Sequence, residues 1–183
     1  MQIEFMAYAG DCRVAGHVEL TGERLTDMLN DSPSLRLRDV LLESLEDGRL
    51  LELADMELHR DEVFAVEAVG PRGEASRRLR TRSHRMQVSL GPYLVMGQLH
   101  TMPGADPMNS ILRRDPMVPL TNATIGYTIS GQTMMRDVET LIVNRELADW
   151  INPAAGEHLA FPDTPILTPA PGDYYAKDLT GSF

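Results

Sequence analysis

Residues 5–20, FMAYAGDCRVAGHVEL, align without a gap with residues 86–101, MQVSLGPYLVMGQLHT. The alignment pairs Gly16 with Gly97 and keeps apolar residues such as Val14 and Val95 at matching positions. A long internal similarity of this kind is the sequence signature of a duplicated structural unit. The chain is therefore expected to contain two related units, one after the other.

The similarity extends beyond these opening segments. Pro33 aligns with Pro116, and LHRDEV aligns with IVNREL after small insertions. The extent of the aligned segments predicts a first β-unit at 1–69, an arginine-rich linker or edge strand at 70–85, a second β-unit at 86–151 and a tail at 152–183. A unit of about 70 residues is close to the size at which a lone core is only marginally stable, so we expect the units to pack on each other.

Each unit has the pattern of a short antiparallel structure. The opening segment alternates apolar and polar residues around a turn, which predicts a β-hairpin. A second hairpin follows, with its turn at Gly48 in the first copy and at Gly131 in the second. A short strand closes each copy, although ELADWI at 146–151 is also compatible with a helical turn. Gly16 and Gly97 lie inside strands, where glycine marks a bulge or a close approach of two backbones.

One short helix is predicted between the two hairpins of each unit. Leu25, Met28 and Leu29 fall on one face of the helix in the first copy. In the second copy, Asp106 is suited to cap the helix and Pro107 to occupy its first position. The sequence thus predicts a mainly β protein, with two tandem small antiparallel β-barrel-like units, each with one short helix, and a flexible proline-rich C-terminal tail.

Two short segments carry a resemblance to a known family. RLTDMLN at 24–30 resembles the "RLSDFLN"-like helix of an uncharacterised bacterial domain family, and the segment Val143-Asn144-Arg145 resembles its later "VNK" or "VNR" strand. The strand order and turn glycines are also loosely similar to those of Sm-like small β-barrels. The resemblance covers about residues 5–151 and implies no known activity.

Composition and charge narrow the class of protein. Hydrophobic residues make up 43% of the chain and charged residues 24%, as in an ordinary globular protein. The net charge of −10 disfavours general binding to nucleic acid or to anionic membranes. No apolar run reaches the ~18 residues that span a bilayer, and the N-terminus lacks the pattern of a signal peptide. The single cysteine, Cys12, excludes an internal disulfide. We therefore expect a cytoplasmic protein that does not associate with membranes.

No catalytic or metal-binding motif is recognisable in the sequence. The histidines show no H-x-x-x-H or H-E-x-x-H spacing, so we expect no metal site. Neither a G-x-S-x-G nucleophile turn nor a phosphate-binding glycine loop is present. The sequence therefore predicts a non-enzymatic protein without catalytic residues, metals or cofactors.

Positive charge is concentrated in one segment. In RRLRTRSHR, residues 77–85, alternate side chains such as those of Arg78, Arg80, Arg82 and His84 would share one face of an extended strand. The candidate anion- or partner-binding residues are Arg77, Arg78, Arg80, Arg82, His84 and Arg85. The segment is equally compatible with an exposed strand whose charge prevents edge pairing. The absence of an aromatic residue from it weakens a role in stacking single-stranded RNA.

The tail is rich in proline but keeps aromatic residues that a purely solvating segment would lack. The candidate docking residues are Phe161, Tyr174, Tyr175 and Phe183. With the duplicated β-unit, they favour a non-enzymatic adaptor or scaffold that contacts partner proteins through its β-units and its tail. The alternative hypothesis is an RNA- or anion-binding module that uses residues 77–85. Open strand edges would also permit a homo-oligomer.

Overall fold

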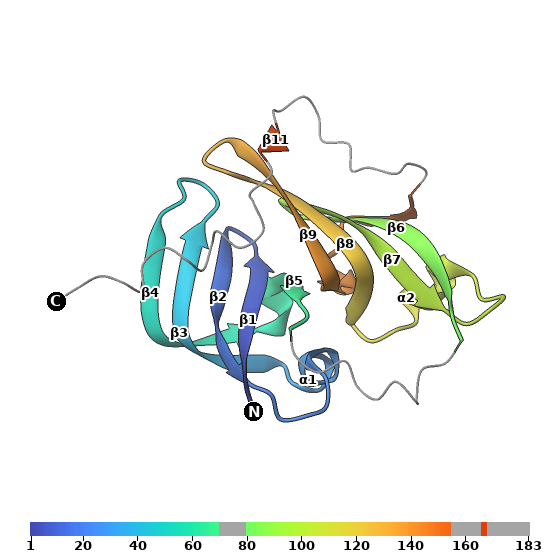
Figure 1. Ribbon diagram of the computed structural model, residues 1–183, viewed down its shortest axis with the longest axis horizontal. Coiled ribbons are helices and arrows are strands. Elements are labelled where there is room, and N and C mark those ends of the chain that lie inside the picture. The colour runs from blue at the N-terminus through green and yellow to red at the C-terminus, as the bar shows by residue number, and fades with distance from the viewer. Residues whose placement is uncertain (70–79, 155–165, 168–183) are drawn as a thin grey trace.

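Strands make up most of the structure, a computed structural model that describes residues 1–69, 80–154 and 166–167 (Figure 1). The protein is mainly β, with antiparallel strands and few helices, as the alternating sequence pattern predicts. None of the described helices has the length and apolar character needed to cross a membrane.

The first unit has five strands and one short helix between the second and the third. Its elements are β1 (Gln2–Ala9), β2 (Cys12–Glu19), α1 (Leu25–Asp31), β3 (Ser34–Ser44), β4 (Leu50–His59), the 3-10 turn η1 (Arg60–Glu62) and β5 (Val63–Glu67). The strands lie in the order β5-β1-β2-β3-β4. The predicted apolar face of α1, formed by Leu25, Met28 and Leu29, is buried.

The second unit repeats this plan. Its elements are β6 (Arg82–Leu90), β7 (Tyr93–Thr101), α2 (Pro107–Leu112), β8 (Met117–Ile129), β9 (Gln132–Asn144), the 3-10 turn η3 (Arg145–Leu147) and β10 (Trp150–Pro153). The strand order is β10-β6-β7-β8-β9, which matches the first unit strand for strand. The predicted cap is confirmed, because the Asp106 side chain accepts a hydrogen bond from Asn109 N at 2.7 Å.

The limits of the second unit differ from those predicted at both ends. Because β6 begins at Arg82, residues 82–85, predicted as a linker or an edge strand, are the start of a strand of the second unit. The closing strand β10 ends at Pro153 and not at residue 151. The segment 146–151 combines the two structures considered for it, since it holds most of a 3-10 turn and the start of this strand.

The two units share one continuous sheet. Strand β9 of the second unit pairs antiparallel with β5 of the first, which places β4 and β10 at the two ends of the sheet. A short strand from the tail, β11 (Ile166–Leu167), pairs in parallel with β9. The units are therefore joined edge to edge. Among the described strands, β4 does not pair with β5 and β9 does not pair with β10, so neither unit closes on itself.

Equivalent hydrogen bonds show how the copies correspond after the second hairpin. Arg60 N donates to Pro33 O at 2.8 Å, and Arg145 N donates to Pro116 O at 2.9 Å. Arg60 therefore corresponds to Arg145, and the sequence alignment of LHRDEV with IVNREL is wrong by one residue. The β8–β9 hairpin has longer strands than the β3–β4 hairpin, and an insertion near a turn cannot be placed from similarity between the flanking strands.

A bulge lies opposite the equivalent glycine in both units, with the extra residue on β3 or β8. The register of β2 against β3 shifts at Gly16, and that of β7 against β8 shifts at Gly97. On the partner strands, Asp39 and Asn122 have positive φ values of 49° and 46°. A Cβ atom on Gly97 would lie 2.9 Å from Leu120 Cβ, closer than real Cβ contacts allow. The predicted bulge and close approach are confirmed.

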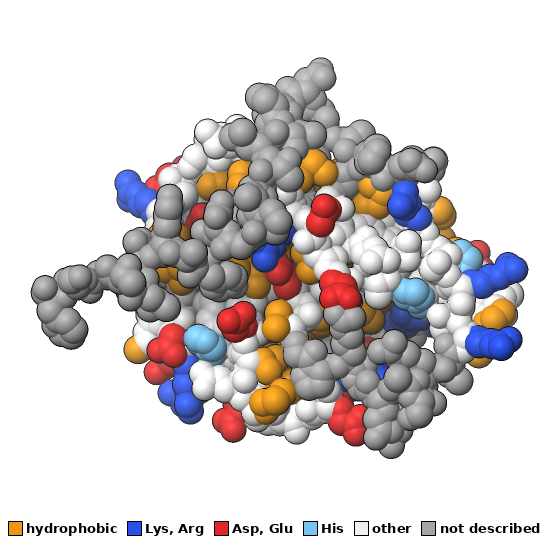
Figure 2. All heavy atoms as spheres, in the orientation of Figure 1, with side chains coloured by type: hydrophobic (Ala, Val, Ile, Leu, Met, Phe, Trp, Pro, Cys, Tyr) orange, Lys and Arg blue, Asp and Glu red, His pale blue; other side chains and the backbone are white. Residues whose placement is uncertain are grey.

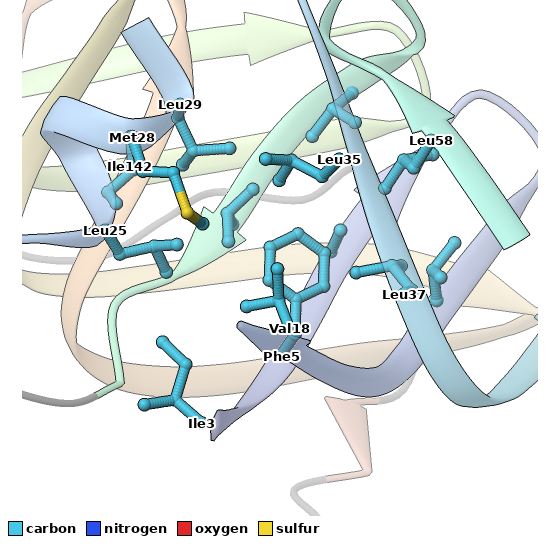
Figure 3. Packing of buried hydrophobic residues seen from close by; sticks show 14 of the residues in the cluster. Ile3, Phe5, Val18, Leu25, Met28, Leu29, Leu35, Leu37, Leu58 and Ile142 are labelled. Carbon is cyan, nitrogen blue, oxygen red and sulfur yellow. The ribbon is translucent and has the colours of Figure 1, made fainter. Parts of the chain in front are cut away.

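Two hydrophobic cores lie on opposite faces of the strands at the join. Phe5 of β1 lies in the first core and Tyr8 in the second, because successive side chains of a strand point to opposite faces. Strand β9 likewise contributes Ile142 to the first core and Leu141 to the second. Figure 3 shows Ile142 beside the α1 residue Leu29 in the first core. The cores are thus built on shared strands.

Candidate functional site

The basic segment at 77–85 does not form one surface within the described residues. Arg80 lies just before β6 and is exposed, while Arg82, His84 and Arg85 lie in β6. The side chains of Arg82 and His84 alternate with that of Arg85, which therefore projects from the opposite face of the strand. On the face that Figure 2 shows, acidic and basic side chains are interspersed.

Several predicted residues lie outside the described residues. These are Arg77 and Arg78 of the basic segment, and the tail residues Phe161, Tyr174, Tyr175 and Phe183. The only described part of the tail beyond residue 154 is β11.

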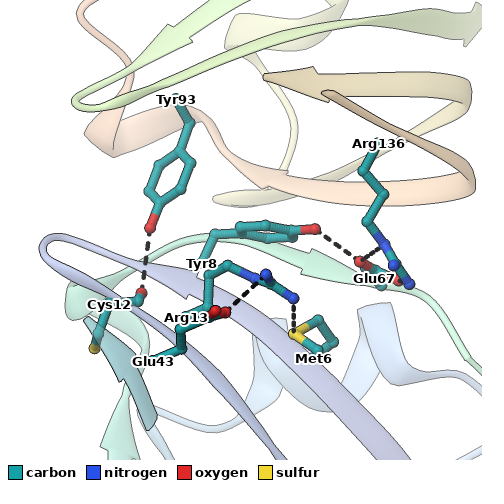
Figure 4. Close-up of polar contacts among 8 residues, drawn as sticks. All are labelled: Met6, Tyr8, Cys12, Arg13, Glu43, Glu67, Tyr93 and Arg136. Atoms are coloured by element: carbon teal, nitrogen blue, oxygen red, sulfur yellow. Dashed lines mark hydrogen bonds and ion pairs between the residues drawn. The ribbon is translucent and has the colours of Figure 1, made fainter. Parts of the chain in front are cut away.

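A buried ion pair lies at the join between the units and was not predicted from the sequence. Glu67 of β5 receives a hydrogen bond from the Tyr8 hydroxyl at 2.7 Å and pairs with Arg136 Nε at 2.7 Å (Figure 4). Glu67 is 7% exposed and Tyr8 is fully buried. Burial raises the pKa of Tyr8 well above its usual range, and the Glu67 charge raises it further. This contact links β1, β5 and β9 across the two units.

A second buried cation lies on β2. Arg13 is 3% exposed, pairs with Glu43 at 2.8 Å and lies over the Tyr127 ring at 5.4 Å from its centroid. Beside it, the Tyr93 hydroxyl donates to Ala9 O at 2.6 Å. Arg13 and Tyr93 therefore hold the β1–β2 hairpin of the first unit against the second unit. An arginine in the middle of an apolar strand is a signal in the sequence that could have revealed this contact.

Burial sets the protonation states of these polar groups. Burial and the nearby Asp11 raise the pKa of the Cys12 thiol to about 11, so it is protonated at neutral pH and is not a nucleophilic thiolate. The raised pKa values of Tyr8 and Tyr93, both caused mainly by burial, keep their phenols neutral. Among the described residues, no group of three or more His, Cys, Asp or Glu side chains could hold a metal ion.

Open strand edges are the most distinctive surface of the described structure. Strands β4 and β10 end the sheet, and their outer sides pair with no described strand. Large apolar side chains are exposed on both, with Leu50 at 62%, Leu51 at 55% and Trp150 at 41%. Exposed apolar residues on an unpaired edge are typical of a surface that binds another strand.

Strand β9 has a third open stretch, which we call the β9 outer edge (residues 133–138). Strand β5 covers only Leu141, Ile142 and Val143 of β9. Further along the same strand, β11 pairs with Thr133 and Met134. A segment of the tail is thus added as a parallel strand to part of the sheet that β5 leaves open.

A hollow of about 750 Å³ lies among the turns of the two units, and we call it the turn groove. Turns from both units line it, with Gly10, Asp11, Cys12, Leu42, Ser44, Leu45, Glu46, Arg49, Leu51, Pro92, Thr128 and Gly131 at its walls. Thr128 pairs with Thr133 of β9, and Gly131 directly precedes β9, so the groove lies beside the turn of the β8–β9 hairpin. Its walls combine apolar side chains with a few charged ones.

Comparison with family models, with curated proteins and with solved structures found no match. The resemblance of residues 24–30 and 143–145 to an uncharacterised bacterial family stays a prediction, as does the similarity to Sm-like barrels.

Proposed function

We propose that the protein is a non-enzymatic scaffold that binds an extended segment of a partner protein along an open strand edge. The observation that carries the proposal is the pairing of β11 with β9, because the sheet accepts an added strand there. Strand addition of this kind takes its affinity from main-chain hydrogen bonds and its specificity from neighbouring pockets. We place the scaffold in the cytoplasm, which a single unpaired cysteine supports.

The backbone of the β9 outer edge is suited to this role. Thr140 O accepts a hydrogen bond from Ala68 N at 2.9 Å on the β5 side of β9. Because the backbone groups of every second residue face the same side of an antiparallel strand, those of Met134 face that side as well. The ion pair of Arg136 with Glu67 holds β9 in place within this stretch. The edge is therefore a firm template for an extended peptide.

The turn groove gives such a peptide side-chain contacts. Leu42, Leu45 and Leu51 contribute apolar surface, and Asp11 and Arg49 contribute charge. A bound segment that follows β9 towards its first residue would reach this groove. The two-residue strand β11 makes a short contact, which a longer partner segment can replace.

RNA or anion binding through residues 77–85 remains an alternative hypothesis. The described basic residues divide between the two faces of β6, and the chain carries a net charge of −10. Both features weaken phosphate neutralisation as the main source of affinity.

The test is capture of partner proteins from native lysate by the full-length protein. Met134→Pro removes the N–H group that Met134 presents on the β11 side of β9, and Met134→Leu is the matched control that keeps it. We expect a partner captured by the wild type and by Met134→Leu but lost with Met134→Pro. Identical partner lists for all three proteins, or no partner for the wild type, would refute the proposal.

A further inference from the structure

The two ends of the sheet are formed by strands that are the repeat equivalents of the two strands at the junction between the units. Within the chain, β9 of the second unit pairs with β5 of the first. By strand order, β4 is the repeat equivalent of β9, and β10 is the equivalent of β5. Each chain therefore carries a second copy of each junction strand, and among the described strands both have an unpaired outer side.

We propose that a second copy of this chain docks head to tail, with β4 of one copy paired antiparallel to β10 of the next. The internal β9–β5 junction is the template for this contact, and the sheet would continue from one molecule into another. The inference goes beyond the proposed scaffold function and rests on different strands from the β9 outer edge.

The register of the internal β9–β5 junction predicts the register of the β4–β10 contact between copies. Leu37 pairs with Met56 in the first unit as Leu120 pairs with Leu141 in the second, so Met56 corresponds to Leu141. In the same way, Ala7 pairs with Val66 as Val88 pairs with Ile151, so Ile151 corresponds to Val66.

This correspondence gives the pairs expected between two copies. The pairs at the internal junction are Ala65–Val143, Val66–Ile142 and Glu67–Leu141. Their equivalents between two copies are Trp150–Leu58, Ile151–Glu57 and Asn152–Met56.

The side chains on the two free edges fit this assignment. Leu50, Leu51 and Trp150 are among the most exposed large apolar residues in the described structure, and all three lie on β4 or β10. In this register Trp150 lies beside Leu58 of β4, so pairing the edges would reduce the exposure of Trp150. Leu50 and Leu51 lie further along β4, beyond the four residues of β10.

Charge also favours contact between unlike edges. Strand β4 exposes Glu52, Asp55 and Glu57 and contains no lysine or arginine. On the other end of the molecule, Arg82 and Arg85 are exposed in β6, before the residues 86–89 that pair with β10. In the register of the junction, Glu52 would lie level with this basic part of β6, while Asp55 and Glu57 would lie opposite Pro153 and Ile151 of β10. Two β4 edges would instead repel each other.

The contact between copies should be weaker than the junction within the chain. Ala68 donates its N–H to Thr140 O in the junction, but Pro153 takes the equivalent position and has no N–H. The buried Glu67–Arg136 pair also has no counterpart, since Asn152 and Leu51 occupy the equivalent positions. We therefore expect a reversible, concentration-dependent assembly. A head-to-tail contact generates either a closed ring or an open filament.

The mass of the full-length protein in solution tests the assembly. Glu57 corresponds to Ile142, whose backbone faces β5, so the N–H of Glu57 faces the open side of β4. Glu57→Pro removes that donor, and Glu57→Gln is the matched control. By analytical ultracentrifugation up to about 100 µM, we expect multiples of 20.4 kDa for the wild type and Glu57→Gln. Glu57→Pro should stay at 20.4 kDa or need at least about tenfold more protein to associate.

Cross-linking tests the register and does not depend on how well the proline variant folds. Met56→Cys with Asn152→Cys places two thiols at a predicted non-hydrogen-bonded pair, where Cβ atoms lie closest. Glu52→Cys with Asn152→Cys, out of register on the same strand, is the control. Oxidation should give an intermolecular ladder for the first pair only. The inference is overturned if the wild-type protein keeps a mass of 20.4 kDa at every concentration. It is also overturned if the two cysteine pairs cross-link equally. Partner capture through Met134 is unaffected by either result.

Discussion

At the scale of single residues, Glu67 accepts hydrogen bonds from two units at once, and this gives a first prediction. Glu67→Gln removes the negative charge that faces Arg136 and Tyr8. We expect a loss of about 2 kcal/mol in the free energy of unfolding. This is below the 3–5 kcal/mol typical of a fully buried pair, because the Arg136 side chain keeps 26% of its surface exposed. Urea denaturation measures the loss.

The exposed pair of Arg36 with Asp55 is the control for this prediction. Its side chains are 74% and 56% exposed, and its closest N–O distance is 3.5 Å. Arg36→Met should therefore change stability by less than about 1 kcal/mol. Equal losses for the two variants would mean that the Glu67 contact does not hold the units together.

A second residue-scale prediction concerns alkaline pH. Burial raises the pKa of the Cys12 thiol from 9.0 to about 11 in the folded protein. Above pH 9 the unfolded chain therefore loses this proton more readily than the folded one, which favours unfolding. The contribution of Cys12 to stability is fully present below pH 9 and is lost as the pH rises through about 11. Cys12→Ala should flatten the fall of the urea midpoint between pH 9 and 11, and an unchanged slope would contradict the assignment.

At the scale of elements, the strand glycines give a third prediction. A Cβ on Gly97 would lie 2.9 Å from Leu120 Cβ and 3.1 Å from Ala123 Cβ, so neighbouring strands must move apart to admit it. Gly97→Ala should lower the free energy of unfolding by about 1–3 kcal/mol. Gly10→Ala is the matched control, since its Cβ meets only Phe64 at an ordinary 3.8 Å. Thermal denaturation of both variants compares them, and equal midpoints would argue against a packed bulge.

The elements were largely predictable because their signals are local. Alternation around turn glycines predicted the hairpins, the apolar face of α1 predicted the first helix, and Asp106 predicted the cap of α2. The one-residue error between Arg60 and Arg145 arose near a turn, where insertions leave no trace in the flanking pattern. The bulges at Gly16 and Gly97 were predictable for a different reason, since glycine inside a strand is costly unless the backbone needs it.

At the scale of the whole molecule, the sequence predicted two units but not the way they join. Strand β1 is buried from Phe5 to Ala9 on both of its faces, and a continuous buried run does not indicate which neighbours cover it. The β9–β5 pairing and the Glu67–Arg136 contact depend on residues far apart in the chain. Open strand edges were expected from the sequence, but not which strands carry them, because an edge is defined by pairing and not by a motif.

Because the two cores share strands, we predict that the two units unfold together. Leu37 is fully buried in the first core, and Leu37→Ala should cost about 3 kcal/mol. The only tryptophan, Trp150, lies in the closing strand of the second unit, so its fluorescence reports on that unit. Because β1, β5 and β9 contribute to both cores, Leu37→Ala should lower the urea midpoints of Trp150 fluorescence and of far-ultraviolet circular dichroism by the same amount. A fluorescence transition that stays at its wild-type midpoint would show that the second unit is stable without the first.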